Sequence, residues 1–419
     1  METKMLNPRS IAALAAAVAA GLLGCQMSAS TRGVKTTSED GIAAQYERYT
    51  GPLHAKRYQT MEQITFTEQG GDYDPAVSPD GTKLIYSSTV QSEVPDIYMK
   101  SIGEKANAAT RVQLTNSNYA EIQPCFSPDG KSFAYATNRR GNWDICIESL
   151  GGGNPRHVTE SMKTDEISPC WHPGGEWIAF STFNPRTLRW ELAAKSLKTG
   201  QLRRFGEGLF PKFSPDGRRI VFQRPRDREP RWYSVWIIDV DEEFNVGLPM
   251  EVVSSAKWAA INPSWSPDGK YLTFATVHES PQAQSTRRIL MGDDIWLVNL
   301  DGQDLVRLTD SPEPESHPVW APAKGGKPGL IYFCSMQTGP KNIWALQPSM
   351  PSVYGSVSGP LPGPEPASTP EKAPKGGVEP PGSGAAGQGK TSAPANAPAS
   401  SGGEEPAKVQ GLPANSATE

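Results

Sequence analysis

The sequence has few cysteines, few histidines and no excess of basic residues, and each shortage excludes a class of function. The five cysteines and five histidines among 419 residues are scattered and match no zinc-ligand spacing. Lysine and arginine total 41 against 45 acidic residues, a net charge of −4, whereas nucleic-acid-binding domains are typically basic. We therefore expect no metal, no cofactor and no nucleic-acid partner.

Long apolar runs are also lacking. The longest, residues 11–23, is about 13 residues, shorter than the ~20 that a membrane-spanning helix needs. Lys4 and Arg9 precede it, and this order of a basic and an apolar region is typical of a signal peptide.

The apolar run ends in Leu22-Leu23-Gly24-Cys25, which resembles a bacterial lipobox. The resemblance implies cleavage before Cys25 and lipidation of its sulfur, and Gln26 in place of Asp favours the outer membrane. The alternative is an ordinary secretory signal peptide with an incidental cysteine. We predict a signal peptide at 1–24, a tether at 25–60, and a lipid-anchored protein on the periplasmic face of the outer membrane.

Glycine and proline are abundant, together 79 residues, and both are poor in helix interiors. This excludes a helical bundle. The last segment, 350–419, has 13 prolines and 12 glycines but no Trp or Phe, so it cannot bury enough apolar surface to offset the entropy of ordering. We predict a disordered C-terminal tail there.

Six copies of one motif occupy the middle of the chain, and four of them read Pro-x-x-Ser-Pro-Asp-Gly. The copies lie at 75–81, 124–130, 169–175, 211–217, 263–269 and 318–323. Short aromatic and β-branched runs follow each copy at similar offsets, which predicts β-strands. Ser-Pro-Asp-Gly predicts a reverse turn with a capping Asp and a glycine at positive φ. Four strands every 40–50 residues is the period of a propeller blade.

These repeats resemble the β-propeller repeats of the TolB family over roughly residues 61–349. The resemblance implies an all-β, six-bladed β-propeller. The last copy has only three predicted strands, and the segment 62–67 resembles the outer strand of a blade. We predict that this N-terminal strand completes the last blade and closes the ring.

The cysteines other than Cys25 are expected to be isolated thiols. Cys125 and Cys146 fall on the first and third strands of one predicted sheet, roughly 9–10 Å apart, and a disulfide needs Cα atoms within ~7 Å. A weaker pairing of Cys125 with Cys170, between neighbouring blades, stays open.

Propellers of this kind also precede serine hydrolase domains, which need a G-x-S-x-G elbow followed by Asp and His. The nearest match, residues 355–359, has Val357 at the nucleophile position, and His317 is the last histidine. Oligogalacturonate lyases resemble TolB propellers and use histidines with a metal, but no histidine cluster is visible here. We predict no catalytic residues.

Two charged sets are expected on one face of the ring. Acids three residues before four of the repeat prolines, with His317 beside the last, would surround the channel mouth: Asp72, Glu121, Glu166 and Glu315. The loops after the second strands would add a partner-binding rim of arginines and tryptophans, residue types enriched among interface hot spots. This rim consists of Arg139, Arg140, Trp143, Arg186, Arg189, Arg224, Arg226, Arg228, Arg231, Trp232, Arg287 and Arg288. The alternative is a solvated surface whose arginines pair with neighbouring acids, and a structural role for His317.

The resemblance implies a non-enzymatic, protein-binding scaffold of the cell envelope, a monomer whose partner is an envelope protein such as the peptidoglycan-associated lipoprotein or a Tol component. Two features depart from TolB. TolB has an α/β domain before its propeller, whereas about 35 residues are expected between Cys25 and the first repeat here. TolB is soluble in the periplasm, whereas a lipidated Cys25 would fix this protein to a membrane. The alternative function is an enzyme acting on carbohydrate or peptide, or a small-ligand or metal-binding protein, that uses the acids at the channel mouth.

Overall fold

The computed structural model describes residues 58–102, 111–227, 231–279, 290–302, 305–322 and 329–349. They fall within one unit, Met1–Tyr354, and form 24 β-strands in six four-stranded sheets, with no helix among the described residues. The signal peptide, Cys25, the tether before residue 58 and the tail from residue 350 lie outside these residues.

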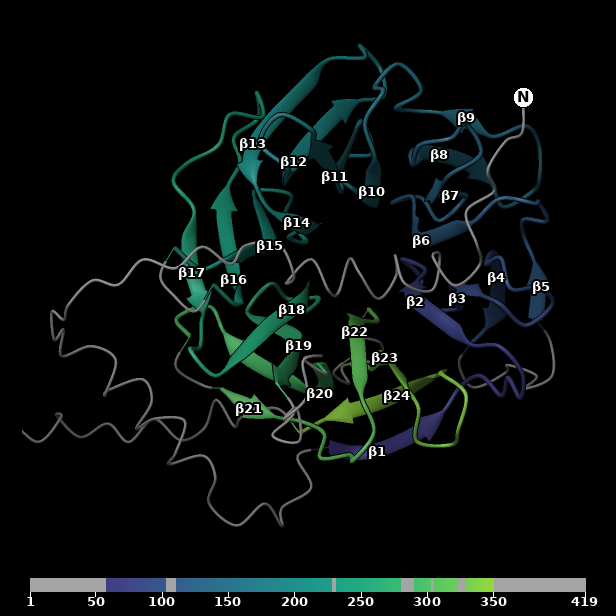
Figure 1. The fold of residues 1–419 in the computed structure, drawn as a ribbon, viewed down its shortest axis with the longest axis vertical. Coiled ribbons are helices and arrows are strands. Elements are labelled where there is room, and N and C mark those ends of the chain that lie inside the picture. The colour runs from purple at the N-terminus through teal and green to yellow at the C-terminus, as the bar shows by residue number, and fades with distance from the viewer. Residues whose placement is uncertain are drawn as a thin grey trace, which may run out of the picture. The chain divides into compact units, whose positions relative to one another are not determined.

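Each sheet is one blade of an all-β, six-bladed propeller, with its strands ordered outward from a common axis (Figure 1). The innermost strands are β2 (Asp72–Val77), β6 (Glu121–Phe126), β10 (Glu166–Trp171), β14 (Leu209–Phe213), β18 (Trp258–Trp265) and β22 (Glu315–Trp320). The second strands are β3 (Lys83–Ser88), β7 (Ser132–Thr137), β11 (Trp177–Asn184), β15 (Arg219–Pro225), β19 (Tyr271–Glu279) and β23 (Ile331–Ser335). The third strands are β4 (Asp96–Ser101), β8 (Asp144–Ser149), β12 (Arg189–Ser196), β16 (Tyr233–Asp239), β20 (Leu290–Asn299) and β24 (Asn342–Pro348). The outermost strands are β5 (Arg111–Gln113), β9 (Arg156–His157), β13 (Leu202–Glu207), β17 (Met250–Val253), β21 (Val306–Arg307) and β1 (Tyr58–Gln63).

The N-terminal strand closes the ring, as predicted. β1 pairs antiparallel with β24, with Met61 opposite Leu346, so the first strand completes the last blade. Its bounds differ from the predicted 62–67. The chain leaves the ladder after Gln63 because the next residues turn toward the first blade, yet the backbone N–H groups of Ile64 and Thr65 still donate to the Ile343 carbonyl at 2.8 and 3.2 Å.

The Ser-Pro-Asp-Gly motifs form the predicted reverse turns between first and second strands. In the first copy the Ser78 hydroxyl donates to Asp80 at 2.5 Å, and the Gly81 N–H donates to the Ser78 carbonyl at 2.8 Å. Gly81 has a φ of +67°, where a side chain would be strained. His172 replaces the serine of the third turn and packs against Phe213 at 5.0 Å between ring centroids, so its role is structural.

The core lies between the blades, because each sheet packs both of its faces on neighbours. Each second strand places an aromatic ring at the same position, and all six rings are at most 4% exposed. These residues are Tyr86, Tyr135, Phe180, Phe222, Phe274 and Tyr332. Burial of each such side chain contributes about 1.5–3 kcal/mol, so the short apolar runs of the sequence are the main source of stability.

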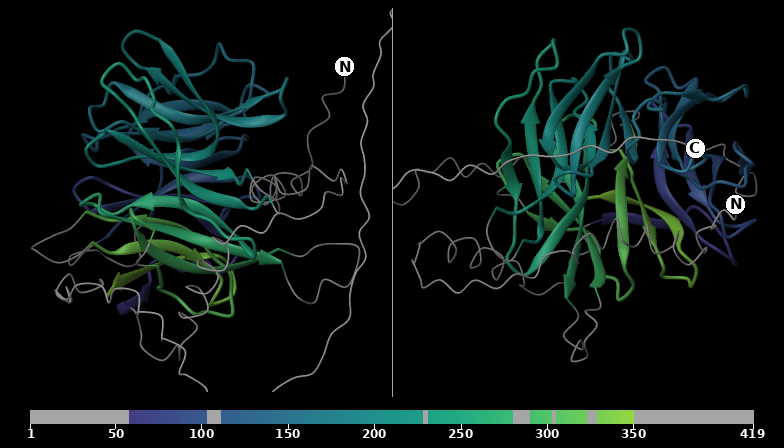
Figure 2. Two further views of the ribbon diagram at one scale, coloured as in Figure 1. Left: turned by 90° about the vertical axis from the view of Figure 1, so that its left-hand side faces the viewer. Right: turned by 45° about the horizontal axis from the view of Figure 1, so that its top comes forward.

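Alternating strand direction sorts the connections onto two faces, which lie at opposite ends of the strands (Figure 2). The loop face carries the segments that enter each innermost strand and the loops that join second and third strands. The turn face carries the Ser-Pro-Asp-Gly turns and the loops that join third and fourth strands. Both predicted charged sets belong to the loop face.

Candidate functional site

Every innermost strand bends at the residue before its repeat proline. These residues have φ between +51° and +56°, an uncommon conformation for residues other than glycine, and a register shift marks a β-bulge at each. They are Asp74, Gln123, Ser168, Phe210, Asn262 and His317, called the axial ring below. A bulge re-aims a side chain, and here it does so in all six blades around the axis.

The axial ring is tied together by hydrogen bonds between neighbouring blades. The Gln123 side-chain oxygen accepts bonds from the backbone N–H and the hydroxyl of Ser168 at 2.8 and 3.0 Å. The Gln223 side-chain oxygen likewise accepts from the Asn262 N–H at 2.8 Å. These bonds fix the bent residues and therefore the geometry of the axis.

Side chains from three blades meet at His317. Its Nε2 lies 3.3 Å from the Asp74 carboxylate, and its ring lies 6.2 Å from that of Phe210, measured between centroids. β14 and β22 belong to blades that are not neighbours, so the Phe210–His317 contact crosses the axis. Burial lowers the pKa of His317, Asp74 raises it, and Lys341 and Lys212 lower it further.

Two lysines stand beside this group. Lys341 Nζ lies 5.4 Å from the centroid of the Tyr73 ring, and Tyr73 adjoins Asp74 on β2. Lys212 follows Phe210 by two residues on β14. Neither ammonium has an ion-pair or hydrogen-bond partner in the described part of the chain.

The four predicted channel-mouth acids each begin an innermost strand, but they do not face the solvent. Asp72, Glu121, Glu166 and Glu315 are 0% exposed, which corrects the expectation of an open acidic mouth. They are enclosed by the segment that enters each strand and by the second strand or the loop after it: Asp72 accepts from the Thr67 and Ser88 hydroxyls at 2.9 and 2.6 Å. Burial raises the pKa of Glu166 and of Glu315 to about 7.

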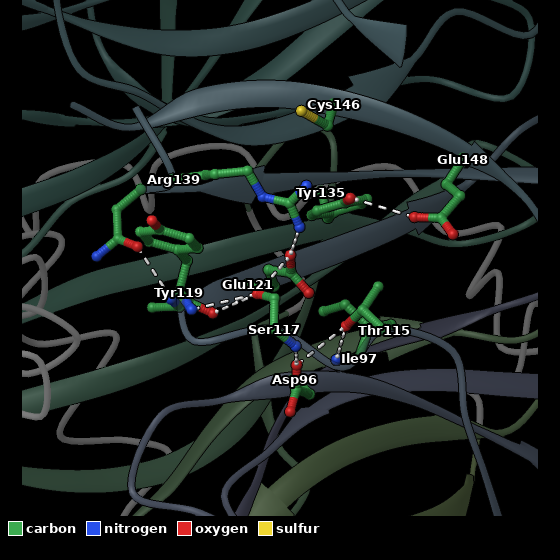
Figure 3. Close-up of polar contacts among 12 residues, drawn as sticks. Asp96, Ile97, Thr115, Ser117, Tyr119, Glu121, Tyr135, Arg139, Cys146 and Glu148 are labelled. Carbon is green, nitrogen blue, oxygen red and sulfur yellow. Dashed lines mark hydrogen bonds and ion pairs between the residues drawn. The ribbon is translucent and has the colours of Figure 1, made fainter. Parts of the chain in front are cut away.

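A second buried acid accompanies three of these carboxyls, as Figure 3 shows for Glu121 and Asp96. Ser117 joins the two, since its hydroxyl donates to Glu121 at 3.0 Å and its N–H donates to Asp96 at 3.1 Å. Burial raises the pKa of both acids. The equivalent pairs are Asp144 with Glu166 and Asp294 with Glu315.

Most described arginines of the predicted rim are held by acids, the alternative that the sequence left open. Four form ion pairs at 2.6–3.3 Å: Arg139 with Glu121, Arg140 with Glu160, Arg189 with Glu207, and Arg224 with Asp227. Arg186 and Arg231 are exposed.

The prediction was wrong for two residues of the rim, Arg226 and Trp143, which are buried. Arg226 is 4% exposed because its side chain turns inward to donate to the Ser255 carbonyl at 3.0 Å. Trp143 is 7% exposed and packs in the core. Trp232 is half-buried against the same core. Arg228, Arg287 and Arg288 lie outside the described residues.

Exposed apolar side chains on the loop face were not predicted. Of the eight large apolar residues that are strongly exposed in the described residues, four lie on loop-face segments: Phe66, Tyr119, Leu188 and Met336. The Arg139 guanidinium lies 5.9 Å from the Tyr119 ring centroid. Leu188 is 75% exposed and has a φ of +54°. The sequence carried no signal for these residues beyond their places in loops.

The axial ring was also missed apart from His317, although its signal was present as the residue before each repeat proline. Cys125, Cys146, Cys170 and Cys334 are free thiols, as expected. Within the described ranges no group of three His, Cys, Asp or Glu residues could hold a metal ion, and no helix there is long and apolar enough to cross a membrane.

Comparison with known proteins agrees with this architecture. The TolB beta propeller domain matches residues 44–258. The uncharacterized protein Atu1656 of Agrobacterium fabrum is 26% identical over 211 residues, which cover 48% of this chain and 68% of that protein. The Tol-Pal system protein TolB of Francisella tularensis is 26% identical over 239 residues, 55% of this chain and 53% of that protein, so the chain spans about half the length of this relative.

Among solved structures, a putative TolB from Agrobacterium tumefaciens superposes with a TM-score of 0.49 at 18% identity, over 70% of this chain and 97% of that one. The domain match covers more than half of the 419 residues. The chain therefore belongs to the TolB β-propeller domain family.

Proposed function

We propose that this protein is a lipid-anchored, non-enzymatic scaffold of the cell envelope that binds a protein partner on the loop face of its propeller. Membership of the TolB propeller family supports an envelope role, since several relatives are Tol-Pal system proteins. The partner we expect is an envelope protein, such as a peptidoglycan-associated lipoprotein or a Tol component.

The exposed apolar side chains of the loop face carry the proposal. Phe66, Tyr119, Leu188 and Met336 lie at blade junctions and hairpins from the last blade to the third. Aromatic residues and methionine are enriched in protein interfaces. The paired arginines nearby add fixed polar groups, of the kind found at an interface rim.

Leu188 gives the strongest support, because both the exposure of its side chain and the conformation of its backbone are unfavourable in the isolated propeller. Its side chain is 75% exposed, and its left-handed backbone, φ +54°, costs a residue with a Cβ about 1–2 kcal/mol. Asn and Gly tolerate that conformation far better. Retention of a strained and exposed leucine suits a contact made only with a partner.

The enclosure of the inner acids favours a scaffold over an enzyme. Acid–base catalysis requires a carboxyl within hydrogen-bond reach of its substrate, whereas Asp72, Glu121, Glu166 and Glu315 are 0% exposed. At least one oxygen of each carboxyl accepts a bond from a side chain of the same blade or of the segment that enters it.

Capture of solubilised envelope proteins tests the proposal, with Leu188→Asn compared against Leu248→Asn. Leu248 is 92% exposed on the turn face, so it is a matched control. We expect Leu188→Asn to reduce partner capture about tenfold, equivalent to ~1.4 kcal/mol, and to leave the unfolding temperature unchanged or raised. Leu248→Asn should capture as the wild type does.

Equal capture by wild type and Leu188→Asn, or an equal loss in both variants, would contradict loop-face binding. Because asparagine suits the left-handed backbone, misfolding cannot explain a loss confined to Leu188→Asn. The unfolding temperature of each variant verifies this.

The lipid anchor is tested separately. We expect Cys25→Ser to move the protein from the membrane fraction to the soluble periplasmic fraction, because the acyl chains would be lost. Continued membrane association of Cys25→Ser in high salt would refute lipidation at this cysteine.

A further inference from the structure

We infer that the axis of the propeller holds a binding site for a small organic anion that carries a carboxylate and at least one hydroxyl group. The site consists of Lys341, Lys212, His317, Asn262 and Phe210. It is separate from the exposed apolar residues of the loop face, so it does not depend on the proposed docking function.

The first observation is an excess of unpaired cationic groups. Lys212 and Lys341 have no ion-pair or hydrogen-bond partner in the described residues, and Asp74 is already used by His317 at 3.3 Å and by the Ser87 hydroxyl at 3.3 Å. Unpaired charges in a partly enclosed place are costly. A carboxylate bound beside His317, whose pKa both lysines lower, would offset this cost, because charge-assisted hydrogen bonds are the stronger kind.

The second observation is an unpartnered amide at the same place. Asn262 is 8% exposed, and its side-chain oxygen has no hydrogen-bond partner in the described residues. A buried acceptor left unpaired costs about 1–3 kcal/mol. Asn262 stands in the axial ring between Phe210 and His317, so a hydroxyl of the bound anion would satisfy it.

The side chains of the site differ in exposure. Phe210 is 8% exposed, while the side chains of His317 and Asp74 keep 31% and 16% of their exposure. A ligand would therefore approach from the His317 side, and the Phe210 ring, whose centroid lies 6.2 Å from that of His317, would form an apolar wall. This arrangement suits a small molecule, with its charged end toward the lysines and its body against Phe210.

Histidine-ring NMR of the full chain tests the site, with D-glucuronate as the probe and D-glucose as its neutral counterpart. His317→Gln assigns the His317 signal, and sodium chloride keeps the ionic strength constant. We expect glucuronate to shift the His317 signal saturably and glucose to leave it unchanged. Lys212→Met combined with Lys341→Met should weaken glucuronate binding at least about tenfold.

Lys198→Met is the control, because Lys198 is 75% exposed and pairs with Glu176 at 3.8 Å, remote from the axis in the β12–β13 turn. It should bind glucuronate as the wild type does, and so should Leu188→Asn. If the double variant folds poorly, the single Lys341→Gln variant, on the loop-face side, replaces it.

Three results would overturn the inference. They are no saturable His317 shift with glucuronate, an unchanged affinity in the lysine variants, or an equal shift with glucose. Loss of partner capture in Leu188→Asn would change none of these three results. The anion site and loop-face docking can therefore be refuted independently.

Discussion

Glu166 and Glu315 each begin an innermost strand and are fully enclosed, and burial raises the pKa of each to about 7. The ordinary value is 4.5. The folded protein therefore holds these protons more tightly than the unfolded chain. Its free energy of unfolding falls as the pH rises from 4.5 to about 7 and levels off above that, because deprotonation then places charge in the core.

We predict that the unfolding temperature drops by about 5 °C between pH 5 and pH 8, measured by calorimetry. Glu166→Gln with Glu315→Gln mimics the protonated carboxyls and should flatten this dependence. The pKa of Asp80 is lowered to about 2 by hydrogen bonds from Ser78 and Thr82. Asp80 therefore changes the unfolding temperature only at more acidic pH. A drop of equal size in the double variant would show that the two carboxyls are not its cause.

At the residue scale, position was predictable and burial was not. The acids were correctly expected at the start of the innermost strands, because the repeat sets their register. Their burial, like that of Arg226 and Trp143, depends on loops from adjoining blades that no local pattern describes. The Phe210–His317 contact joins residues over 100 positions apart in sequence, and only closure of the ring brings them together.

At the scale of elements, the turns followed closely from sequence, since Ser, Pro, Asp and Gly each meet a local backbone requirement. The third copy differs, because His172 replaces serine and its ring packs into the next blade. An added Cβ at Gly217 would meet His172 Nε2 at 2.4 Å, whereas at Gly269 it would meet only Pro215 at 3.7 Å. The two glycines have similar φ, +75° and +68°.

Gly217→Ala and Gly269→Ala should therefore differ in cost. Both place alanine in the left-handed region, for about 1 kcal/mol each, but Gly217→Ala should cost about 1–2 kcal/mol more through its clash with His172. Urea denaturation measures the difference. His172→Ser, which restores the serine of the other turns, should remove the extra cost from Gly217→Ala; equal costs for the two glycines at the outset would refute the clash.

Strand β1 shows where prediction of an element was approximate. Its pairing with the last blade was expected from the missing fourth strand, but its bounds lie at Tyr58–Gln63 because Ile64 and Thr65 bond to Ile343, and Thr67 to Asn342, outside the ladder. The sequence alone did not show that the strand ends at Gln63 and that residues 64–67 lie outside the sheet.

At the scale of the whole molecule, this strand joins the two ends of the ring. Met61 packs against the core, while its neighbour Thr60 is exposed, as alternation along a strand requires. We predict that Met61→Asp lowers the free energy of unfolding by about 2–3 kcal/mol, whereas Thr60→Asp changes it by less than about 0.5 kcal/mol. Equal effects in thermal denaturation would mean that β1 does not contribute to closure through its buried face.

The ring also decides which surface meets a partner. Six blades with alternating strands place all entry loops on one face and all Ser-Pro-Asp-Gly turns on the other, and the strained Leu188 lies on the former. The sequence identified this face through its charged residues, but the structure shows that most of those charges are paired and that exposed apolar side chains accompany them.

Site-specific photo-crosslinking in cells tests loop-face binding most directly. A photoreactive residue is placed at Leu188 or Tyr119 on the loop face, and at Leu248 or Met250 on the turn face, all of them exposed. We predict crosslinked adducts with an envelope protein from the loop-face positions alone. Adducts from the turn-face positions alone, or equally from both faces, would contradict the account.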